Sequence, residues 1–464
     1  MKRLRLLLLG LIVVWVQAAS ASGQVIDLTG WQLNTTSATG HSTDATINSY
    51  VSQIPADVHE VWGSTDYVYV KSSGVPSYDV GPFPDGNPSY PSDRNWQLRF
   101  TRSPQAATGA HTDTPLGSIG LWVNGVPMFN PKDAHSYNNQ NIWHSNAVVV
   151  EADGFDAALG HPAPVQGAMG NPVPGIYHHH QLSPSLTAQL GGVSPSQFSP
   201  LLGFAFDGFP VYGPYGYANA DGTGGITRMT SSYQLRNISQ RHSLADGTAL
   251  PSNEWGPDVS ATYPLGYFVE DYEYVSGLGL LDQYNGRLTV TPDFPDGTYA
   301  YFATIDSLGN NAYPYVVGPS YYGVVDTSDY SGSVTIPGGA VQYTPGDFNL
   351  DGTVDMADYV LWRKGSANST DYATWRSHFD ATAGTGAGAL ISVPEPGSIV
   401  FVVTGIAALL CWSRRRWNGR TAALLARLTV IEAHLTGSDR PRKRENRLSV
   451  TTHPNSARPG RASG

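Results

Sequence analysis

Histidines gather in one short part of this sequence. Of its 13 histidines, three are consecutive at positions 178–180, and His161 precedes them in a Gly-His-Pro turn. If 176–181 is a strand, His178 and His180 point to one face and His179 points to the other. Neutral imidazoles two residues apart can chelate one Zn, Cu or Fe ion. We therefore predict a transition-metal site formed by His178 and His180, with His161 as a third ligand.

A carboxylate is the natural fourth member of such a site. Asp207 lies in a Gly- and Pro-rich turn downstream of the histidines. It is a candidate fourth ligand, a group that orients a ligand, or a catalytic general base. The alternative is that the histidines are structural, each bound to a separate backbone carbonyl. Convergence of His161, His178 and His180 on one open position would distinguish the two interpretations.

A second metal site is predicted near the C-terminal end of the exported part. Oxygen-bearing residues occupy positions one, three, five, seven, nine and twelve of a loop that has Gly352 at position six. This spacing is typical of a Ca²⁺ loop, in which six to eight oxygens surround one ion. The predicted calcium ligands are Asp347, Asn349, Asp351, the Thr353 carbonyl, Asp355 and Asp358.

The elements that must position the histidines are predicted to be strands. Six short segments are rich in β-branched and aromatic residues, and several alternate apolar with polar positions. They are 67–71, 96–101, 118–123, 147–151, 287–291 and 298–303. Turn signals separate them, and long helical periodicity is missing. We expect residues 22–331 to form a mainly β domain, sandwich-like or a distorted barrel, with long loops.

A smaller module is predicted after this domain. Residues 332–344 have the composition of a linker, and 345–380 contain the calcium loop followed by two copies of Asp-Tyr-x-x-Trp-Arg. We expect this module to be α-helical, and we expect the Gly- and Ala-rich residues 381–392 to form a second linker.

The two ends of the chain carry export and anchoring signals. Residues 1–21 combine a basic start, a short apolar run and an Ala-x-Ala site, which is typical of a signal peptide. Residues 393–416 contain Pro-Glu-Pro, an apolar run and an Arg triplet, and we expect one transmembrane helix there with its arginines cytoplasmic. The basic tail 417–464 is expected to be disordered. The protein is thus predicted to be exported to the outer surface or extracellular matrix.

Charge and cysteine content argue against nucleic-acid binding and against an intramolecular disulfide. The chain holds 27 Lys and Arg against 37 Asp and Glu, and many of the basic residues lie in its terminal segments. An acidic exported body is a poor nucleic-acid binder, because phosphate contacts need clustered basic residues. The single cysteine, Cys411, allows no intramolecular disulfide.

Several ordered motifs between about 110 and 320 resemble the YHYH domain family. They include G-H-P at 160–162, G-I-Y-H-H-H at 175–180 and G-F-A-F-D-G-F-P-V-Y-G-P at 203–214. Further matching segments are 123–130, 136–140, 281–287 and 298–302. His179 stands where the family motif has Tyr, and cysteines that many members carry are absent. The resemblance identifies a domain and implies no particular reaction.

Two shorter resemblances concern the C-terminal part. Residues 345–380 resemble a dockerin module, which implies a cohesin-like partner, although only the first calcium loop is intact here. Residues 393–416 resemble the PEP-CTERM sorting signal, which implies processing by an exosortase. In this chain 48 more residues follow that segment, whereas such signals usually end the chain.

Three functions remain open at this level. The first is an exported, envelope-attached protein that binds Ca²⁺ and one of Zn, Cu or Fe. The second is a non-catalytic module that binds extracellular glycan or a surface, or builds a matrix. The third is a metal-dependent extracellular hydrolase or a cellulosome-like component. Weaker candidates for glycoside hydrolysis are the carboxylates Glu270, Asp271 and Glu273. We interpret them instead as the solvent-exposed face of a strand. Asp282 and Arg287 are expected to form an ion pair.

Overall fold

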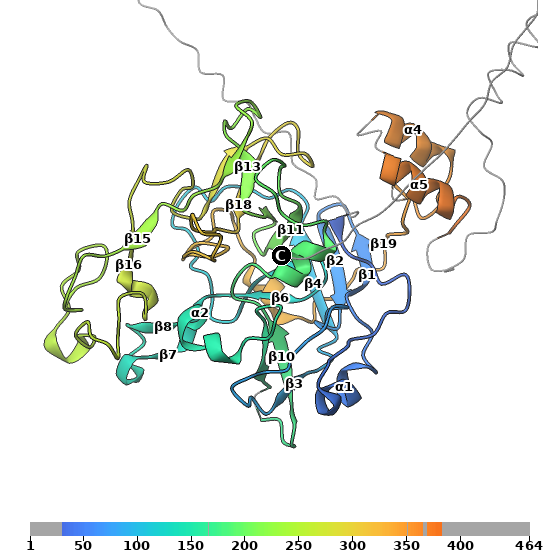
Figure 1. The fold of residues 1–464 in the computed structure, drawn as a ribbon. Helices are drawn as coiled ribbons and strands as arrows, with labels where there is room; N and C mark the ends of the chain where they lie inside the picture. The colour runs from blue at the N-terminus through green and yellow to red at the C-terminus, as the bar shows by residue number, and fades with distance from the viewer. Residues whose placement is uncertain (1–29, 166, 350, 365–368, 383–464) are drawn as a thin grey trace, which may run out of the picture. The chain divides into compact units, whose positions relative to one another are not determined.

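The computed structural model describes residues 30–165, 167–349, 351–364 and 369–382 (Figure 1). The predicted signal peptide (1–21), the PEP-CTERM-like segment (393–416) and the basic tail (417–464) lie outside the described residues, as does most of the predicted linker 381–392. Within the described ranges, no helix has the length and apolar character needed to cross a membrane.

Short strands make up most of the regular structure. A four-stranded sheet has the order β19 (Val341–Gln342), β1 (Val58–Gly63), β2 (Tyr67–Ser72), β4 (Trp96–Thr101). A six-stranded sheet has the order β17 (Gly286–Thr289), β18 (Thr298–Phe302), β12 (Pro210–Tyr212), β11 (Leu201–Ala205), β5 (Ser118–Trp122), β6 (Pro127–Phe129). A three-stranded sheet has the order β3 (Ser89–Pro91), β10 (Val173–His178), β9 (His161–Pro164).

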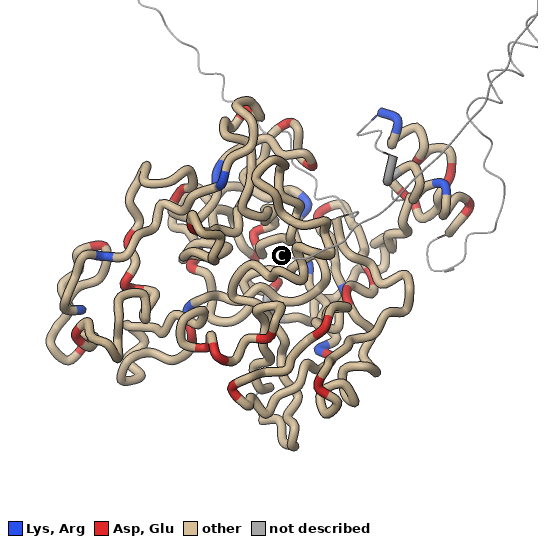
Figure 2. Tube along the Cα trace, viewed as in Figure 1, with Lys and Arg blue, Asp and Glu red and all other residues tan. Residues whose placement is uncertain are grey.

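Among the described residues, three two-stranded ribbons and five short α-helices are the remaining strands and α-helices, and short 3₁₀ turns lie between them. The ribbons are β7 (Lys132–Ser136) with β8 (His144–Asn146), β13 (Tyr215–Tyr217) with β14 (Ile226–Arg228), and β15 (Tyr233–Leu235) with β16 (Tyr272–Tyr274). The helices are α1 (Ala45–Val51), α2 (Ala147–Val150), α3 (Pro184–Gln189), α4 (Met356–Lys364) and α5 (Ser369–His378). Acidic residues are spread along the chain trace rather than gathered in one patch (Figure 2).

The mainly β prediction is confirmed, whereas the barrel alternative is wrong for the described residues. The two large sheets are open, and they share the main hydrophobic core, while a second, smaller cluster contains Tyr212, Ala300 and Phe302 of the six-stranded sheet. Phe100 of β4 lies 5.7 Å from Phe206 and 6.3 Å from Phe204 of β11, measured between ring centroids. Apolar strand faces are thus buried against each other without closing either sheet.

Five of the six predicted strand segments are strands, and one is not. Residues 147–151 form helix α2 and its C-cap, Glu151, despite three consecutive valines. The Ala147 amide donates to the Pro131 carbonyl, and the Glu151 amide donates to the Ala147 carbonyl. The preceding Asn146 amide is bonded to Tyr267. These tertiary bonds at the end of β8 override the intrinsic β preference of valine.

The three-stranded sheet is attached to the edge of the six-stranded sheet next to the histidines. The His179 amide donates to Pro127, and the His179 carbonyl accepts from the Phe129 amide at 2.9 Å. Both contacts are made to β6. The histidine-bearing end of β10 is therefore fixed to the core of the domain.

The predicted helical module contains α4 and α5. The two copies of the Asp-Tyr-x-x-Trp-Arg repeat pack on each other through their aromatic rings. Tyr359 lies 5.0 Å from Trp375, and Trp362 lies 5.0 Å from Tyr372, between ring centroids. The repeat therefore builds the small core of this helix pair.

Candidate metal centre

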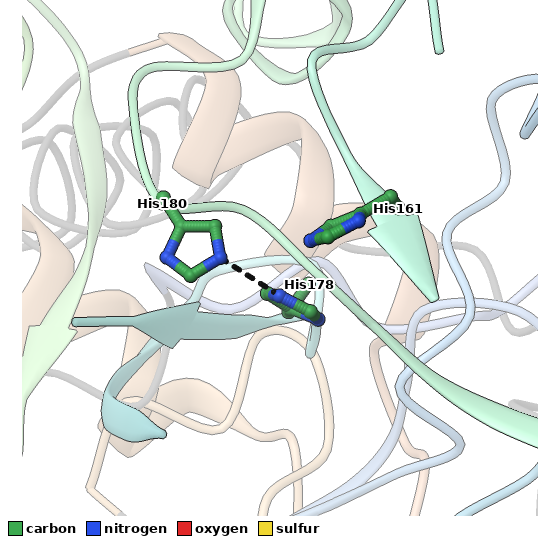
Figure 3. Close-up of side chains that lie close together, drawn as sticks. All are labelled: His161, His178 and His180. Atoms are coloured by element: carbon green, nitrogen blue, oxygen red, sulfur yellow. Dashed lines mark hydrogen bonds between the residues drawn. The ribbon is translucent and has the colours of Figure 1, made fainter. Parts of the chain in front are cut away.

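Three histidines converge in the structure (Figure 3). One nitrogen from each of His161, His178 and His180 lies within 4.8 Å of the other two. His161 begins β9, His178 ends β10, and the two are direct partners in the antiparallel register. His180 follows two residues later and returns its ring to the same side. Strand pairing and side-chain alternation therefore bring the three imidazoles together.

The outer ring nitrogens fix the orientation of two imidazoles. Nδ1 of His178 lies 2.9 Å from the Ile176 carbonyl, and Nδ1 of His180 lies 2.7 Å from the Asn130 carbonyl. A carbonyl can only accept a hydrogen bond, so both Nδ1 atoms are assigned as protonated. In neutral rings, both Nε2 atoms then present lone pairs. This is the tautomer that binds metals through Nε2.

Those two lone pairs face each other. The Nε2 atoms of His178 and His180 are 3.0 Å apart (Figure 3). Such an approach is repulsive unless a proton or another cation lies between or beside them. Burial and the neighbouring imidazoles of His161 and His180 lower the pKa of His178 well below its usual range. An added proton is therefore disfavoured there, and the arrangement suits a metal cation.

Glu151 adds a carboxylate oxygen to the cluster. Its Oε2 lies 3.1 Å from Nε2 of His161 and 3.2 Å from Nε2 of His180. Burial raises the pKa of Glu151, but hydrogen bonds and charge from His161 and His180 in their protonated forms outweigh it and lower that pKa to about 2. A metal cation held by the neutral rings would act on the carboxylate in the same direction. Among the described residues, Glu151 Oε2 and His161 Nε2 are buried without a hydrogen-bond partner. Buried polar atoms that lack a partner are expected where an ion binds.

Aromatic rings enclose the cluster on two sides. Phe129 stacks on His178 with 3.8 Å between ring centroids, and Phe155 meets His161 edge-on at 5.0 Å. The three histidines are at most 8% exposed, whereas the Glu151 side chain is 28% exposed. Glu151 is therefore the member of the set nearest to solvent, while the Oε2 atom that faces the histidines is itself buried.

The loop that leads into His161 is held by one buried aspartate. Asp156 Oδ1 accepts from the amides of Ala158 and Gly160 at 2.9 and 3.0 Å. Its Oδ2 accepts from the Tyr177 hydroxyl at 2.8 Å. A Cβ on Gly160 would lie 2.5 Å from the Tyr177 ring and 2.6 Å from His179. The Gly of the Gly-His-Pro turn is thus needed for close packing behind the cluster.

His179 lies on the opposite face, as the strand alternation predicts. Its Nε2 is 2.7 Å from the Tyr78 hydroxyl, and its Nδ1 is 3.0 Å from the Leu159 carbonyl. Burial lowers the pKa of His179 to about 4. This ring is a packed, hydrogen-bonded part of the core.

Asp207 does not join the cluster. Its Oδ2 accepts from the Tyr301 hydroxyl at 2.6 Å and from the Gly323 amide at 2.9 Å, and its Oδ1 accepts from the Phe209 amide. Burial raises the pKa of Asp207 to about 6 despite these bonds. The carboxylate beside the histidines is Glu151 instead. The sequence reasoning missed Glu151 because it assigned 147–151 to a strand.

The weaker acidic candidates have structural partners. Glu270 receives the His144 amide at 2.7 Å and approaches His144 Nδ1 at 2.8 Å. Asp271 forms a buried bidentate pair with Arg241. Neither lies on the solvated strand face predicted for them, since both belong to the 3₁₀ turn Val269–Asp271.

The expected pair between Asp282 and Arg287 is not formed. Asp282 accepts from the Tyr299 hydroxyl at 2.8 Å, and Arg287 donates to the carbonyls of Tyr217 and Ala218.

The predicted calcium loop has its backbone wrapped inward. Gly352, at position six, has φ +87°, and its amide donates to Asp347 Oδ2 at 2.9 Å. Asp358 accepts from the amides of Phe348, Asn349 and Asp355. The histidine cluster is the one group of three or more potential ligands that converges within the described residues. The loop's Asp side chains therefore do not form such a group by themselves, and the predicted ligand set also includes Asn349 and the Thr353 carbonyl.

Comparison with known proteins gives a family match that covers the cluster. Residues 97–313 match the family model described as YHYH protein. No curated protein and no solved structure matches the chain. The matched region includes Glu151 and all three converging histidines. The histidine cluster therefore lies inside the region that matches the YHYH family model.

Proposed function

We propose that the YHYH domain binds one transition-metal ion through Nε2 of His161, His178 and His180, with Glu151 as the fourth ligand. The observation that carries this proposal is the 3.0 Å approach of the His178 and His180 Nε2 atoms, whose outer nitrogens are both bonded to carbonyls. Metal-ligating histidines commonly have such outer hydrogen bonds, which hold the ring and its tautomer.

The donor set favours particular ions. Three imidazoles and one carboxylate suit Zn, Fe or Cu, whereas Mg²⁺ and Ca²⁺ prefer all-oxygen sites. Thiolate-dependent sites are excluded in this domain because its sequence has no cysteine. Zinc held by three protein nitrogens typically keeps a water in its fourth position.

Glu151 could serve the site in two ways, as a metal ligand or as a base beside a metal-bound water. As a ligand, its carboxylate would close the coordination shell and make the ion structural. If the carboxylate turned aside, a bound water would lie beside an ionised base at the solvent-exposed edge. Metal-activated water attacks esters, amides and glycan-linked groups. Hydrolysis of an extracellular substrate is the reaction that this second arrangement supports.

We also propose that the chain is exported and attached to the cell envelope. The support is sequence pattern alone: a signal peptide at 1–21 and the PEP-CTERM-like segment at 393–416, which would be an exosortase substrate. The calcium loop at Asp347 to Asp358 would bind Ca²⁺, supported by its ligand spacing and the left-handed Gly352. A cohesin-like partner is part of the same dockerin-like proposal.

Metal analysis of the purified exported chain tests the central proposal. Inductively coupled plasma mass spectrometry should find about one equivalent of Zn, Cu or Fe in the wild type. The His178→Ala/His180→Ala variant should lose it. His179→Gln changes the intervening buried histidine and should retain the metal, which controls for disturbance of the strand. A wild-type protein without transition metal after reconstitution would leave the histidines as structural residues.

A further inference from the structure

A cavity of about 540 Å³ lies away from the histidine rings, against the β15–β16 ribbon. This volume is within the range of small-molecule sites. Three tyrosines of the ribbon line it, namely Tyr233, Tyr272 and Tyr274, together with Tyr313. The aromatic content of one wall and the polar residues around it make this cavity a binding-site candidate.

Strand register explains why the tyrosines share one wall. Tyr233 pairs with Tyr274, and Gln234 pairs with Glu273. Side chains alternate along each strand, so Tyr272 and Tyr274 lie on the same face as Tyr233. Gln234 and Glu273 lie on the other face and hydrogen-bond each other at 2.9 Å.

The tyrosine wall is preorganised by ring contacts. Tyr272 stacks on Tyr313 with 4.1 Å between centroids and 12° between planes. Tyr233 meets Tyr313 edge-on at 5.3 Å and contacts Tyr274 at 5.7 Å. All four rings are half-buried. Rings that already hold one another lose little freedom when a ligand binds.

A buried ion pair supports this wall from behind. Arg241 donates to both carboxylate oxygens of Asp271, at 2.6 and 2.8 Å, and both side chains are fully buried. The same guanidinium donates to the carbonyls of Pro257, Tyr263 and Pro264. Asp271 directly precedes Tyr272 and follows Glu270 in the sequence, so the pair fixes two cavity-lining residues.

The polar residues of the cavity are mainly acidic. Glu270, Asp113 and Asp246 line it with one cation, Lys132. His144 contacts both Glu270 oxygens, which orients that carboxylate. Three carboxylates against one ammonium disfavour an anionic ligand. A wholly apolar ligand would remove Glu270 from water without replacing its hydrogen bonds.

We propose that this cavity binds an uncharged saccharide. The C–H face of a sugar ring would lie on the tyrosine wall, where slightly positive hydrogens meet the negative π-face. Sugar hydroxyls would donate to the carboxylates of Glu270 and Asp246. A quaternary ammonium ion would use the same ring faces, so choline is included in the test as the competing ligand.

The saccharide site and the histidine cluster share backbone but no side chain. Asn130 lines the cavity, and its carbonyl accepts from His180 Nδ1. The saccharide proposal is therefore independent of the metal proposal. Binding should persist after the metal is removed by a chelator.

An oligosaccharide array probed with the purified exported chain, followed by calorimetry on the strongest neutral sugar, tests this inference. We expect saturable binding to neutral sugars and weaker binding to uronate or sulfated ones. Tyr272→Ala should weaken binding about tenfold, because it removes one ring of the wall on which the sugar lies. Gln234→Ala is the matched control, because Gln234 lies on the other face of the same ribbon and outside the cavity lining.

A second variant protects the test against misfolding. Asp246 is exposed, and Asp246→Asn keeps the oxygen that accepts from the Thr248 amide. It should also weaken neutral-sugar binding while the circular dichroism spectrum stays unchanged. The inference is overturned if no neutral sugar binds, if both variants bind like the wild type, or if choline alone binds the cavity.

Discussion

His161 and His178 face each other as direct partners across the antiparallel β9–β10 pair, with 4.6 Å between their ring centroids. Their positions are set by backbone hydrogen bonds of the sheet, and His180 joins them by alternation along the same chain. A side chain from a different element, Glu151 at the end of α2, completes the set. The cluster is therefore held by secondary structure on three sides and by a carboxylate on the fourth.

Removing the Glu151 charge should weaken metal binding without abolishing it. Glu151→Gln keeps the shape of the side chain but loses the negative oxygen beside His161 and His180. We expect the metal affinity to fall by about 10- to 100-fold, the range found when a supporting carboxylate is lost. Competition with a chromogenic chelator measures it. Asp153→Asn, a nearby exposed acid, is the matched control, and equal affinities for both variants would contradict the fourth-ligand role.

Adding a methyl group at Gly160 should destabilise the domain. The new Cβ would lie 2.5 Å from Tyr177 and 2.6 Å from His179, and neither ring can move freely in the core. Gly160→Ala is expected to lower the free energy of unfolding by about 1–3 kcal/mol. Urea denaturation measures this. Gly109→Ala, where no atom lies within 4 Å of the added methyl, should be nearly neutral. Similar losses at both positions would argue against steric conflict as the cause.

The pH dependence of stability should report on Asp207. Burial raises the pKa of Asp207 in the folded protein to about 6, whereas its usual value is 3.8. Between these values the unfolded chain releases a proton that the folded protein retains. Folding stability therefore falls as pH rises from about 4 to 6, by on the order of 3 kcal/mol.

Asp207→Asn tests this dependence. The variant should lack that part of the pH profile when the free energy of unfolding is measured by denaturant titration at a series of pH values. Asp258→Asn, at an exposed position, controls for the loss of one charge. Parallel profiles for the wild type and Asp207→Asn would refute the prediction.

Calcium should stabilise the helical module. Asp351 at loop position five is exposed and holds the turn through the Thr353 amide at 2.9 Å. Trp375 donates to the Asp355 carbonyl at 2.7 Å, so tryptophan fluorescence reports on the loop. Adding Ca²⁺ should change that fluorescence in the wild type and much less in Asp351→Ala. A response to Mg²⁺ of equal size would point to general charge screening instead.

Local patterns predicted the histidine cluster better than its carboxylate. Alternation along a strand was enough to place His178 and His180 together, since the period of two is a property of the backbone. The pairing of His161 with His178 depends on a long-range register that no local pattern specifies. Glu151 was missed because tertiary hydrogen bonds turn a valine-rich segment into a helix. Asp207 was misplaced because its partners, Tyr301 and Gly323, lie far along the chain.

The strand content of the fold was predictable from the sequence, whereas the pairing of strands into sheets was less so. Strand segments such as Tyr67–Ser72 and Trp96–Thr101 follow from β-branched and aromatic composition. The arrangement of open sheets around a shared core depends on which strand edges hydrogen-bond to each other, and each such contact is a meeting of two edges. The His179 contacts with β6 are one such meeting, and the sequence near His179 contains no signal for them.

The partial exposure of Glu151 has a kinetic consequence. The three imidazoles are buried beside Phe129 and Phe155, and the Glu151 side chain is the most exposed member of the set, so an ion that left the cluster would be expected to pass the carboxylate. Release of the ion would then require Glu151 to dissociate and all three histidine nitrogens to release the ion, although their rings are held in place. Ion exchange on the folded domain should consequently be slow compared with exchange on the unfolded chain. The identity of the bound metal would be decided when the domain folds, by whichever suitable ion is present at that moment.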